Sequence, residues 1–292
     1  MIKPNFLICG AAKSGSTALY NVISRHKNIC MSIPKEPNFF RRNFDKGEEW
    51  YSKCFDHYEG ENLVGEASVS NMVDTEITIE RIKDFLGDKN IKFLFILRNP
   101  VERVYSDYFA SVKTGKMRHE DGKFSNFIRG KVKKRDPHTT KYHHERVLKR
   151  SRYSTQVSVF IKEFGKKNVH IIISKDFLRN TEKEANKALS FLGESDLFDR
   201  VGKVKSNEGK YPNEIYEMTL DIRKKMNKYI PNRVKKETSK LRKQVKKILL
   251  TGNRPEMKKS DRKFLSDKYE EDIEFVEKIV GRELDEWRQG KS

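Results

Sequence analysis

Residues 13–17 read Lys-Ser-Gly-Ser-Thr, a combination of cation, glycine and hydroxyl groups that suits a phosphate-like anion. The apolar run from residue 6 to residue 9 predicts a buried strand that ends at Gly10. Beyond residue 17 the apolar spacing becomes helical, with Ala18, Leu19, Val22 and Ile23. We therefore expect a strand, a tight turn and a helix N-terminus, where free N–H groups and the positive end of the helix dipole converge on an anion.

This turn differs from the loop of ordinary nucleoside triphosphatases. Their lysine directly follows the last glycine, where this chain has Ser16. Here Lys13 comes two residues before Gly15, so its charge would reach the anion from the other side of the turn. The alternative is that Gly10 and Gly15 simply permit a tight connection between a strand and a helix.

Arg98 marks a second candidate anion-binding segment. It follows residues 92–97, an almost continuous apolar run that is typical of a central parallel strand. Asn99 and Pro100 are favourable at the start of a helix, and Ser106 would lie two turns into that helix. Ligands of open α/β sheets bind at the carboxyl edge, so we expect Arg98 near the first turn. A salt bridge over the strand end is the alternative.

Glu36 is the candidate general base. Pro34 and Pro37 flank it and exclude a regular helix or central strand, which predicts a stiff loop beside the first turn. A carboxylate held near an anion site can accept a proton from an attacking group. A surface ion pair with Lys35 is the simpler interpretation.

The elements around these residues predict an α/β fold with a central, mainly parallel sheet flanked by helices. Besides the strands at 6–10 and 92–97, the pattern predicts strands at 29–31, 63–68 and 169–173. Helices are expected at 77–86, 153–164 and 185–192, with one closing helix from Tyr269 to Trp287. We expect a single domain over 1–292, with a mobile acceptor-side excursion at 113–150 and a helical C-terminal part at 213–292.

Composition restricts the partners. Lys and Arg number 62 against 42 Asp and Glu, and the resulting net charge of +20 favours anionic partners such as nucleotides, sulfated or phosphorylated substrates, nucleic acid or an acidic membrane surface. No apolar run has the length of a membrane span or the form of a signal segment, which predicts a soluble, cytoplasmic chain. The 3 cysteines, Cys9, Cys30 and Cys54, are expected to be free thiols, and no metal site is expected at residues 143–145.

Taken in order, these segments resemble the sulfotransferases that use 3′-phosphoadenosine 5′-phosphosulfate (PAPS). Residues 13–17 are similar to their 5′-phosphosulfate loop and residues 98–108 to their 3′-phosphate segment. Residues 36–40 are similar to the segment that carries the catalytic glutamate in the heparan sulfate glucosaminyl branch, and residues 269–287 to the closing helix of bacterial and Golgi carbohydrate members. The chain departs from the heparan enzymes at Ala67, where they have a second catalytic lysine, so the acceptor stays open.

The resemblance implies a P-loop-like, three-layer fold and sulfuryl transfer from PAPS, without a metal, to a hydroxyl or amine of a carbohydrate or small molecule. The implied catalytic residues are Lys13, Glu36 and Ser106. The implied nucleotide-binding residues are Lys13, Ser14, Gly15, Ser16, Thr17, Arg98, Ser106, Tyr153, Lys205, Asn207 and Lys210. No specific nucleic-acid partner is implied.

Three alternatives remain open at the level of sequence. A P-loop kinase would require Mg²⁺ ligands and a lysine after the last glycine, and neither is evident. A nucleic-acid-binding module would use the basic run at 223–247 and bind with strong salt dependence. A sulfotransferase fold without activity is the third, and the intact loops argue against it.

Overall fold

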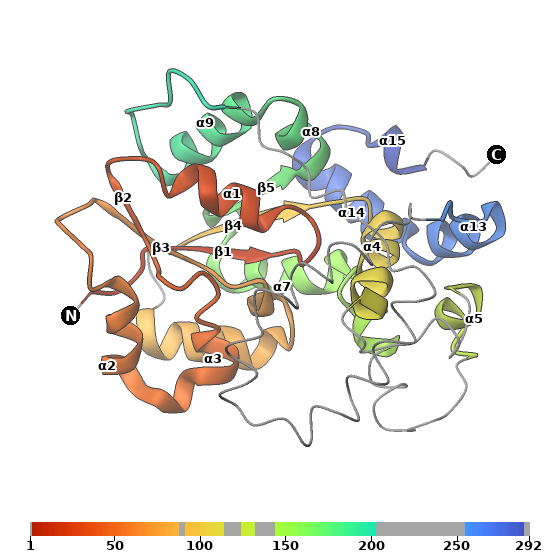
Figure 1. Cartoon of the computed structure of the whole chain (residues 1–292), viewed down its shortest axis with the longest axis horizontal. Coiled ribbons are helices and arrows are strands. Elements are labelled where there is room, and N and C mark those ends of the chain that lie inside the picture. Colours follow the sequence, from red (N-terminus) through yellow and green to blue (C-terminus); the bar gives the residue numbers. More distant parts are fainter. Residues whose placement is uncertain (1, 88–90, 114–123, 132–143, 203–254, 289–292) are drawn as a thin grey trace, which may run out of the picture. The chain divides into compact units, whose positions relative to one another are not determined.

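The computed structural model describes residues 2–87, 91–113, 124–131, 144–202 and 255–288. Five strands form one sheet in the order β2-β3-β1-β4-β5, with β1 at its centre (Figure 1). Every pair in this sheet is parallel, which confirms the predicted sheet. The strands are β1 (Phe6–Gly10), β2 (Ile29–Met31), β3 (Leu63–Ala67), β4 (Lys92–Leu97) and β5 (Val169–Ile173).

Helices cover both faces of the sheet and make a three-layer α/β fold. One face packs against α1 (Ser16–Ile23), α8 (Ser174–Arg179) and α9 (Thr181–Leu192). The other face packs against α2 (Gly47–Ser52), α3 (Thr75–Leu86), α7 (Tyr153–Phe164) and α14 (Glu270–Val280). The remaining helices are α4 (Pro100–Lys113), α5 (Phe124–Ile128), α13 (Lys259–Lys268) and α15 (Asp285–Arg288).

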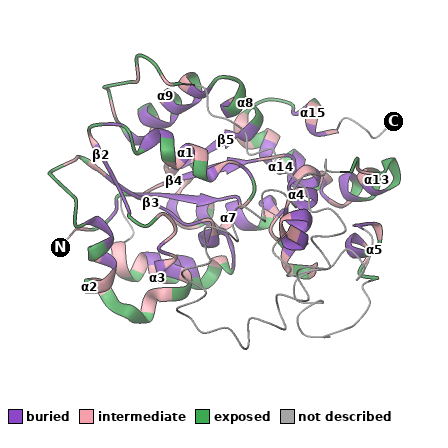
Figure 2. Cartoon of the chain, viewed as in Figure 1, coloured by how far each residue is buried: buried purple, intermediate pink, exposed green. Residues whose placement is uncertain are grey.

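The continuous apolar strands arise because each strand is buried on both faces. In β4, Phe93 and Phe95 point to the core on the α7 side, while Leu94 and Ile96 point to the core on the α1 side. Figure 2 shows this burial along the strands, which are largely purple. Gly65 in β3 lies so close to Phe6 of β1 that an added Cβ would stand 2.2 Å from the ring. This position therefore requires glycine.

The C-terminal segment corrects one prediction. Sequence spacing predicts one closing helix from Tyr269 to Trp287, whereas the structure has two, α14 and α15. Gly281 separates them, because it takes a left-handed conformation (φ 71°) that ends α14. The apolar residues keep a helical repeat across this break, which explains why the pattern looked continuous.

The described residues fall into two compact units. The first lies within 1–104, 148–206 and 265–292 and contains the sheet, and the second lies within 105–147 and 207–264. The predicted single domain and mobile excursion stay predictions, although part of that excursion is helical, at α5 and at 144–149. The basic run at 223–247 lies outside the described residues.

The three cysteines are buried free thiols, as predicted. No helix in the described part of the chain combines the length and apolar character needed to span a membrane.

Candidate active site

Residues 11–15 form the turn between β1 and α1 at the carboxyl edge of the sheet, and Ser16 and Thr17 begin α1. Gly15 precedes the first helical residue in a left-handed conformation (φ 105°), and Lys13 also has a positive φ of 71°. The Ala11 N–H donates to the carbonyl of Ile96 at 2.8 Å, which ties the turn to β4. Backbone geometry therefore places the predicted cradle at the centre of the sheet edge.

Polar groups in this turn are available for an anion. No acidic residue or side-chain cap occupies the first turn of α1, so its N-terminal N–H groups keep their positive field. Ser14 is 1% exposed, and its hydroxyl has no hydrogen-bond partner among the described residues. Lys13 is exposed and makes no ion pair within the described part of the chain. An unsatisfied buried hydroxyl beside a free cation fits an anionic group at this turn.

Arg98 stands at the end of β4, on the strand adjacent to β1. Its side chain is 34% exposed and pairs with Glu102 at 3.5 Å, so the salt bridge considered from the sequence is present but long. Tyr153 donates a hydrogen bond from its hydroxyl to the Arg98 carbonyl at 2.8 Å. Ser14 lies near the same hydroxyl without the alignment for a hydrogen bond. Tyr153 therefore connects the two predicted anion-binding segments.

Burial raises the pKa of Tyr153 to about 12, although Arg103, Ser14 and Arg98 act in the opposite direction. The tyrosine thus stays protonated at neutral pH and serves as a hydrogen-bond donor.

Glu36 lies on the loop that crosses the end of β3, the other neighbour of β1. Its N–H donates to the carbonyl of Ala67 at 3.1 Å, and its backbone has a positive φ of 64°. The carboxylate is 35% exposed and forms an ion pair with Lys35 at 2.7 Å. The Lys35–Glu36 pair inferred from the sequence is therefore present, while the role of Glu36 as a base stays a prediction.

Sequence reasoning missed the polar residues that hold this loop. Asn38 receives a hydrogen bond from Ser70 at 2.6 Å and donates from its side chain to the Glu36 carbonyl at 2.6 Å. Its N–H donates to the Ser68 hydroxyl at 3.0 Å. Asn38 has a positive φ of 52°, a conformation in which asparagine is enriched. The residue type was therefore the only signal of this role in the sequence.

Glu66 forms a second polar group missed from the sequence, buried within β3. Its carboxylate is 0% exposed and accepts hydrogen bonds from Tyr51 and from Asn71, both at 2.9 Å. Burial raises the pKa of Glu66 against the lowering effect of these donors, and the charge of Glu36 adds to the rise. This carboxyl is closed to solvent.

Of the other predicted site residues, Ser16 is buried at the start of α1 and Thr17 is exposed beside it. Ser106 is half-buried in α4, and its place in the site stays a prediction. Lys205, Asn207 and Lys210 lie outside the described residues. No group of His, Cys, Asp and Glu in the described ranges is arranged to hold a metal ion.

Fold and site together define an α/β protein with a phosphate-type loop at the centre of its parallel sheet. The chain matches the sulfotransferase domain family over residues 3–277 and belongs to that family. A crystal structure of a sulfotransferase from Alicyclobacillus acidocaldarius has the same fold, with a TM-score of 0.68, 24% identity and coverage of 99% of this chain and 100% of that one.

Two curated relatives match parts of the chain. A membrane-associated sulfotransferase, kil1, from Dictyostelium discoideum is 36% identical over 113 residues, which are 38% of this chain and 23% of the relative. Heparan sulfate glucosamine 3-O-sulfotransferase 5 from Homo sapiens is 29% identical over 175 residues, 58% of this chain and 47% of the relative. The matches thus span less than half the length of either relative.

Proposed function

We propose that this chain transfers a sulfuryl group from PAPS to a hydroxyl or amine of a carbohydrate or small-molecule acceptor. One observation carries the proposal: Lys13 and Arg98 follow the adjacent strands β1 and β4, and the loop with Glu36 crosses the end of β3, the other neighbour of β1. A base, a cation for the leaving group and a cation for a distant phosphate are the groups that this reaction requires. Membership of the sulfotransferase family supports the same assignment.

The donor nucleotide would lie across β1 and β4. The N–H groups at the start of α1, with Ser14, Ser16 and Thr17, would hold its 5′-phosphate. Arg98 suits the 3′-phosphate, because a guanidinium binds a phosphate through two parallel hydrogen bonds. Ser106, Tyr153, Lys205, Asn207 and Lys210 complete the proposed nucleotide set, in which Tyr153 fixes the backbone of Arg98.

Transfer would proceed in line. Glu36 accepts the proton of the acceptor hydroxyl while the acceptor oxygen forms a bond to sulfur. The bond between sulfur and the bridging oxygen of the 5′-phosphate breaks, and Lys13 stabilises the charge that develops on that oxygen. The products are the sulfated acceptor, adenosine 3′,5′-bisphosphate and a protonated Glu36, which loses its proton to solvent.

The acceptor would bind beside Glu36, at the end of β3. The human relative acts, by its name, on a glucosamine of heparan sulfate, which favours a carbohydrate hydroxyl here. Ala67 offers no cation at the position where the heparan enzymes carry a lysine, so a densely sulfated acceptor has less support than a neutral or lightly charged one.

A sulfate-transfer assay tests the function. Purified protein is incubated with PAPS labelled in its sulfate and with a panel of carbohydrates, alcohols, phenols and amines. Transfer of label to one acceptor class, dependent on protein and absent with Lys13→Ala, is the expected result. A protein that binds PAPS but labels no acceptor class would contradict the assignment as an active sulfotransferase.

A further inference from the structure

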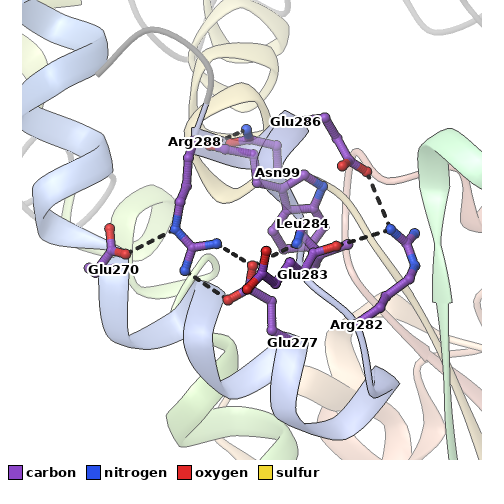
Figure 3. Close-up of polar contacts among 9 residues, drawn as sticks. Asn99, Glu270, Glu277, Arg282, Glu283, Leu284, Glu286 and Arg288 are labelled. Atoms are coloured by element: carbon purple, nitrogen blue, oxygen red, sulfur yellow. Dashed lines mark hydrogen bonds and ion pairs between the residues drawn. The ribbon is translucent and has the colours of Figure 1, made fainter. Parts of the chain in front are cut away.

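Residues 284–288, the end of the described chain, pack beside Asn99, the residue after Arg98 (Figure 3), and we call them the C-terminal clasp. The clasp contains α15 and buries Leu284 and Trp287, which are 0% and 2% exposed. Both side chains join the core on the α7 and α14 side of the sheet. A helix of this length has little stability of its own, so tertiary contacts hold it in place.

Asn99 joins the clasp to the start of α4. Its side-chain amide donates to the Trp287 carbonyl at 2.9 Å. Its side-chain oxygen accepts from the N–H of Val101 at 2.9 Å and from that of Glu102 at 3.4 Å, which caps the helix. One buried amide therefore caps α4 and connects it to the clasp.

Trp287 reaches Arg98 by a second route, through Tyr153. The Trp287 and Tyr153 rings lie 6.4 Å apart between centroids, tilted by 55°. The Tyr153 hydroxyl donates to the Arg98 carbonyl at 2.8 Å. Hydrogen bonds thus hold both residues, one at the Arg98 carbonyl and one at the Asn99 side chain. Trp287 contacts both Tyr153 and Asn99.

Arg288 fastens the clasp to α14. It pairs with both carboxylate oxygens of Glu277, one of them at 2.7 Å, and with Glu270 at 3.2 Å (Figure 3). Glu277 also accepts from the Leu284 N–H at 2.6 Å. The Arg288 guanidinium holds the pKa of Glu277 below its ordinary value, so the pair stays charged at neutral pH.

We propose that the C-terminal clasp positions Arg98 for the 3′-phosphate of the nucleotide, with Trp287 and Arg288 as positioning residues. The inference rests on the proposed function. Within the described residues the Arg98 guanidinium has one long contact, to Glu102 at 3.5 Å. The orientation of the Arg98 side chain therefore depends on its backbone, which the clasp and Tyr153 hold in place. Trp287 and Arg288 thus affect binding of the 3′-phosphate without contacting it.

Three variants separate positioning from other effects. Arg288→Ala unfastens the clasp, and Asn99→Ser keeps a good helix cap while removing the amide that reaches Trp287. Arg282→Ala is the control, because it removes the same charge just before the clasp; its short ion pair is with Asp176, and its contact with the clasp, to Glu286, is 3.9 Å long. Calorimetry then measures the affinity of each protein for adenosine 3′,5′-bisphosphate and for adenosine 5′-phosphate, which lacks the 3′-phosphate.

Arg288→Ala and Asn99→Ser should weaken binding of the bisphosphate about tenfold and leave binding of the 5′-phosphate unchanged, whereas Arg282→Ala should preserve the ratio of the two affinities. Arg288→Lys, which retains a cation for Glu277, should restore most of the ratio. Thermal unfolding in the absence of ligand shows that each variant is folded. A variant that loses both affinities equally, or neither, would refute the positioning role. A wild-type protein that binds both nucleotides equally would instead refute the proposed 3′-phosphate site itself, and the clasp proposal with it.

Discussion

Lys13 is the residue on which the proposed chemistry most depends. Its positive φ holds the side chain on the turn between β1 and α1, where the structure shows it exposed. Replacing Lys13 by alanine should not change the cost of this backbone conformation, since both residues carry a Cβ. The substitution therefore removes the charge and little else.

Lys13→Ala should lower kcat about 10²–10³-fold, while the affinity for adenosine 3′,5′-bisphosphate changes far less. The reason is that the lysine interacts most strongly with charge that develops in the transition state. Steady-state kinetics and calorimetry measure the two effects. Lys53→Ala, which removes an exposed cation paired with Glu49, is the control. An increase in KM alone would assign Lys13 to binding.

Glu36→Gln should reduce sulfate transfer at least about 100-fold with unchanged nucleotide affinity, because the amide keeps the shape but cannot accept a proton. Glu49→Gln, at an exposed glutamate that also pairs with a lysine, should have no effect. The measurement is single-turnover transfer with saturating nucleotide. Normal transfer by Glu36→Gln would point to a histidine, with His57 and His26 the first to replace.

At the scale of elements, β3 and β1 are packed too closely to accept a side chain at residue 65. Gly65→Ala should destabilise the protein by about 1–3 kcal/mol, because the new methyl would meet the Phe6 ring, which is itself 0% exposed. Chemical denaturation measures the free energy of unfolding. Gly202→Ala, where a Cβ meets nothing within 4 Å, should leave stability nearly unchanged. Equal stability of the two variants would show that β3 shifts readily.

The elements predicted best from the sequence are those with an unambiguous apolar pattern. Residues 92–97, 153–164 and 169–173 have the predicted type and bounds, because two-sided burial and helical spacing each leave a clear signature. The break at Gly281 was missed since the spacing of buried residues continues through it.

The sequence predicts the residues of the candidate site but not the hydrogen bonds that hold them in place. The turn at 13–17, Arg98 and Glu36 were found because residue type and strand position are local signals. Three of the hydrogen bonds around them join segments far apart in the chain and leave no local pattern: Ser70 donates to Asn38, Tyr153 to the Arg98 carbonyl, and Asn99 to the Trp287 carbonyl. The sequence predicts Arg98 at the same sheet edge as the first turn, and the strands that precede the two, β4 and β1, are parallel neighbours.

At the scale of the whole molecule, the buried Glu66 should make stability depend on pH. Burial raises its pKa in the folded state, so folding binds a proton and stability falls as pH rises from the unfolded pKa through the folded one. Glu66→Gln can keep contacts with Tyr51 and Asn71 without ionising. Its stability relative to wild type should therefore increase as pH rises from the unfolded pKa of glutamate through the raised pKa of the folded state.

Denaturation curves at several pH values measure this difference. The control is Glu49→Gln, at an exposed side chain, which should follow the wild type at every pH. A Glu66→Gln variant that loses relative stability as pH rises would mean that the folded protein favours the ionised carboxylate.

The hydrogen bond between Asn99 and Trp287 spans 188 residues, and this separation has a consequence during synthesis. At roughly 5–20 residues per second, a ribosome releases the partner of Asn99 roughly ten to forty seconds after Asn99 itself. All five strands are translated well before then. With the clasp as the element that positions Arg98, a chain cut short before residue 284 would have a sheet but a weakened hold on the nucleotide. It would also lack the stabilisation that a bound ligand gives to a folded protein, which leaves it exposed to cellular proteases. Ligand binding would in this way distinguish chains that contain the clasp from chains that lack it.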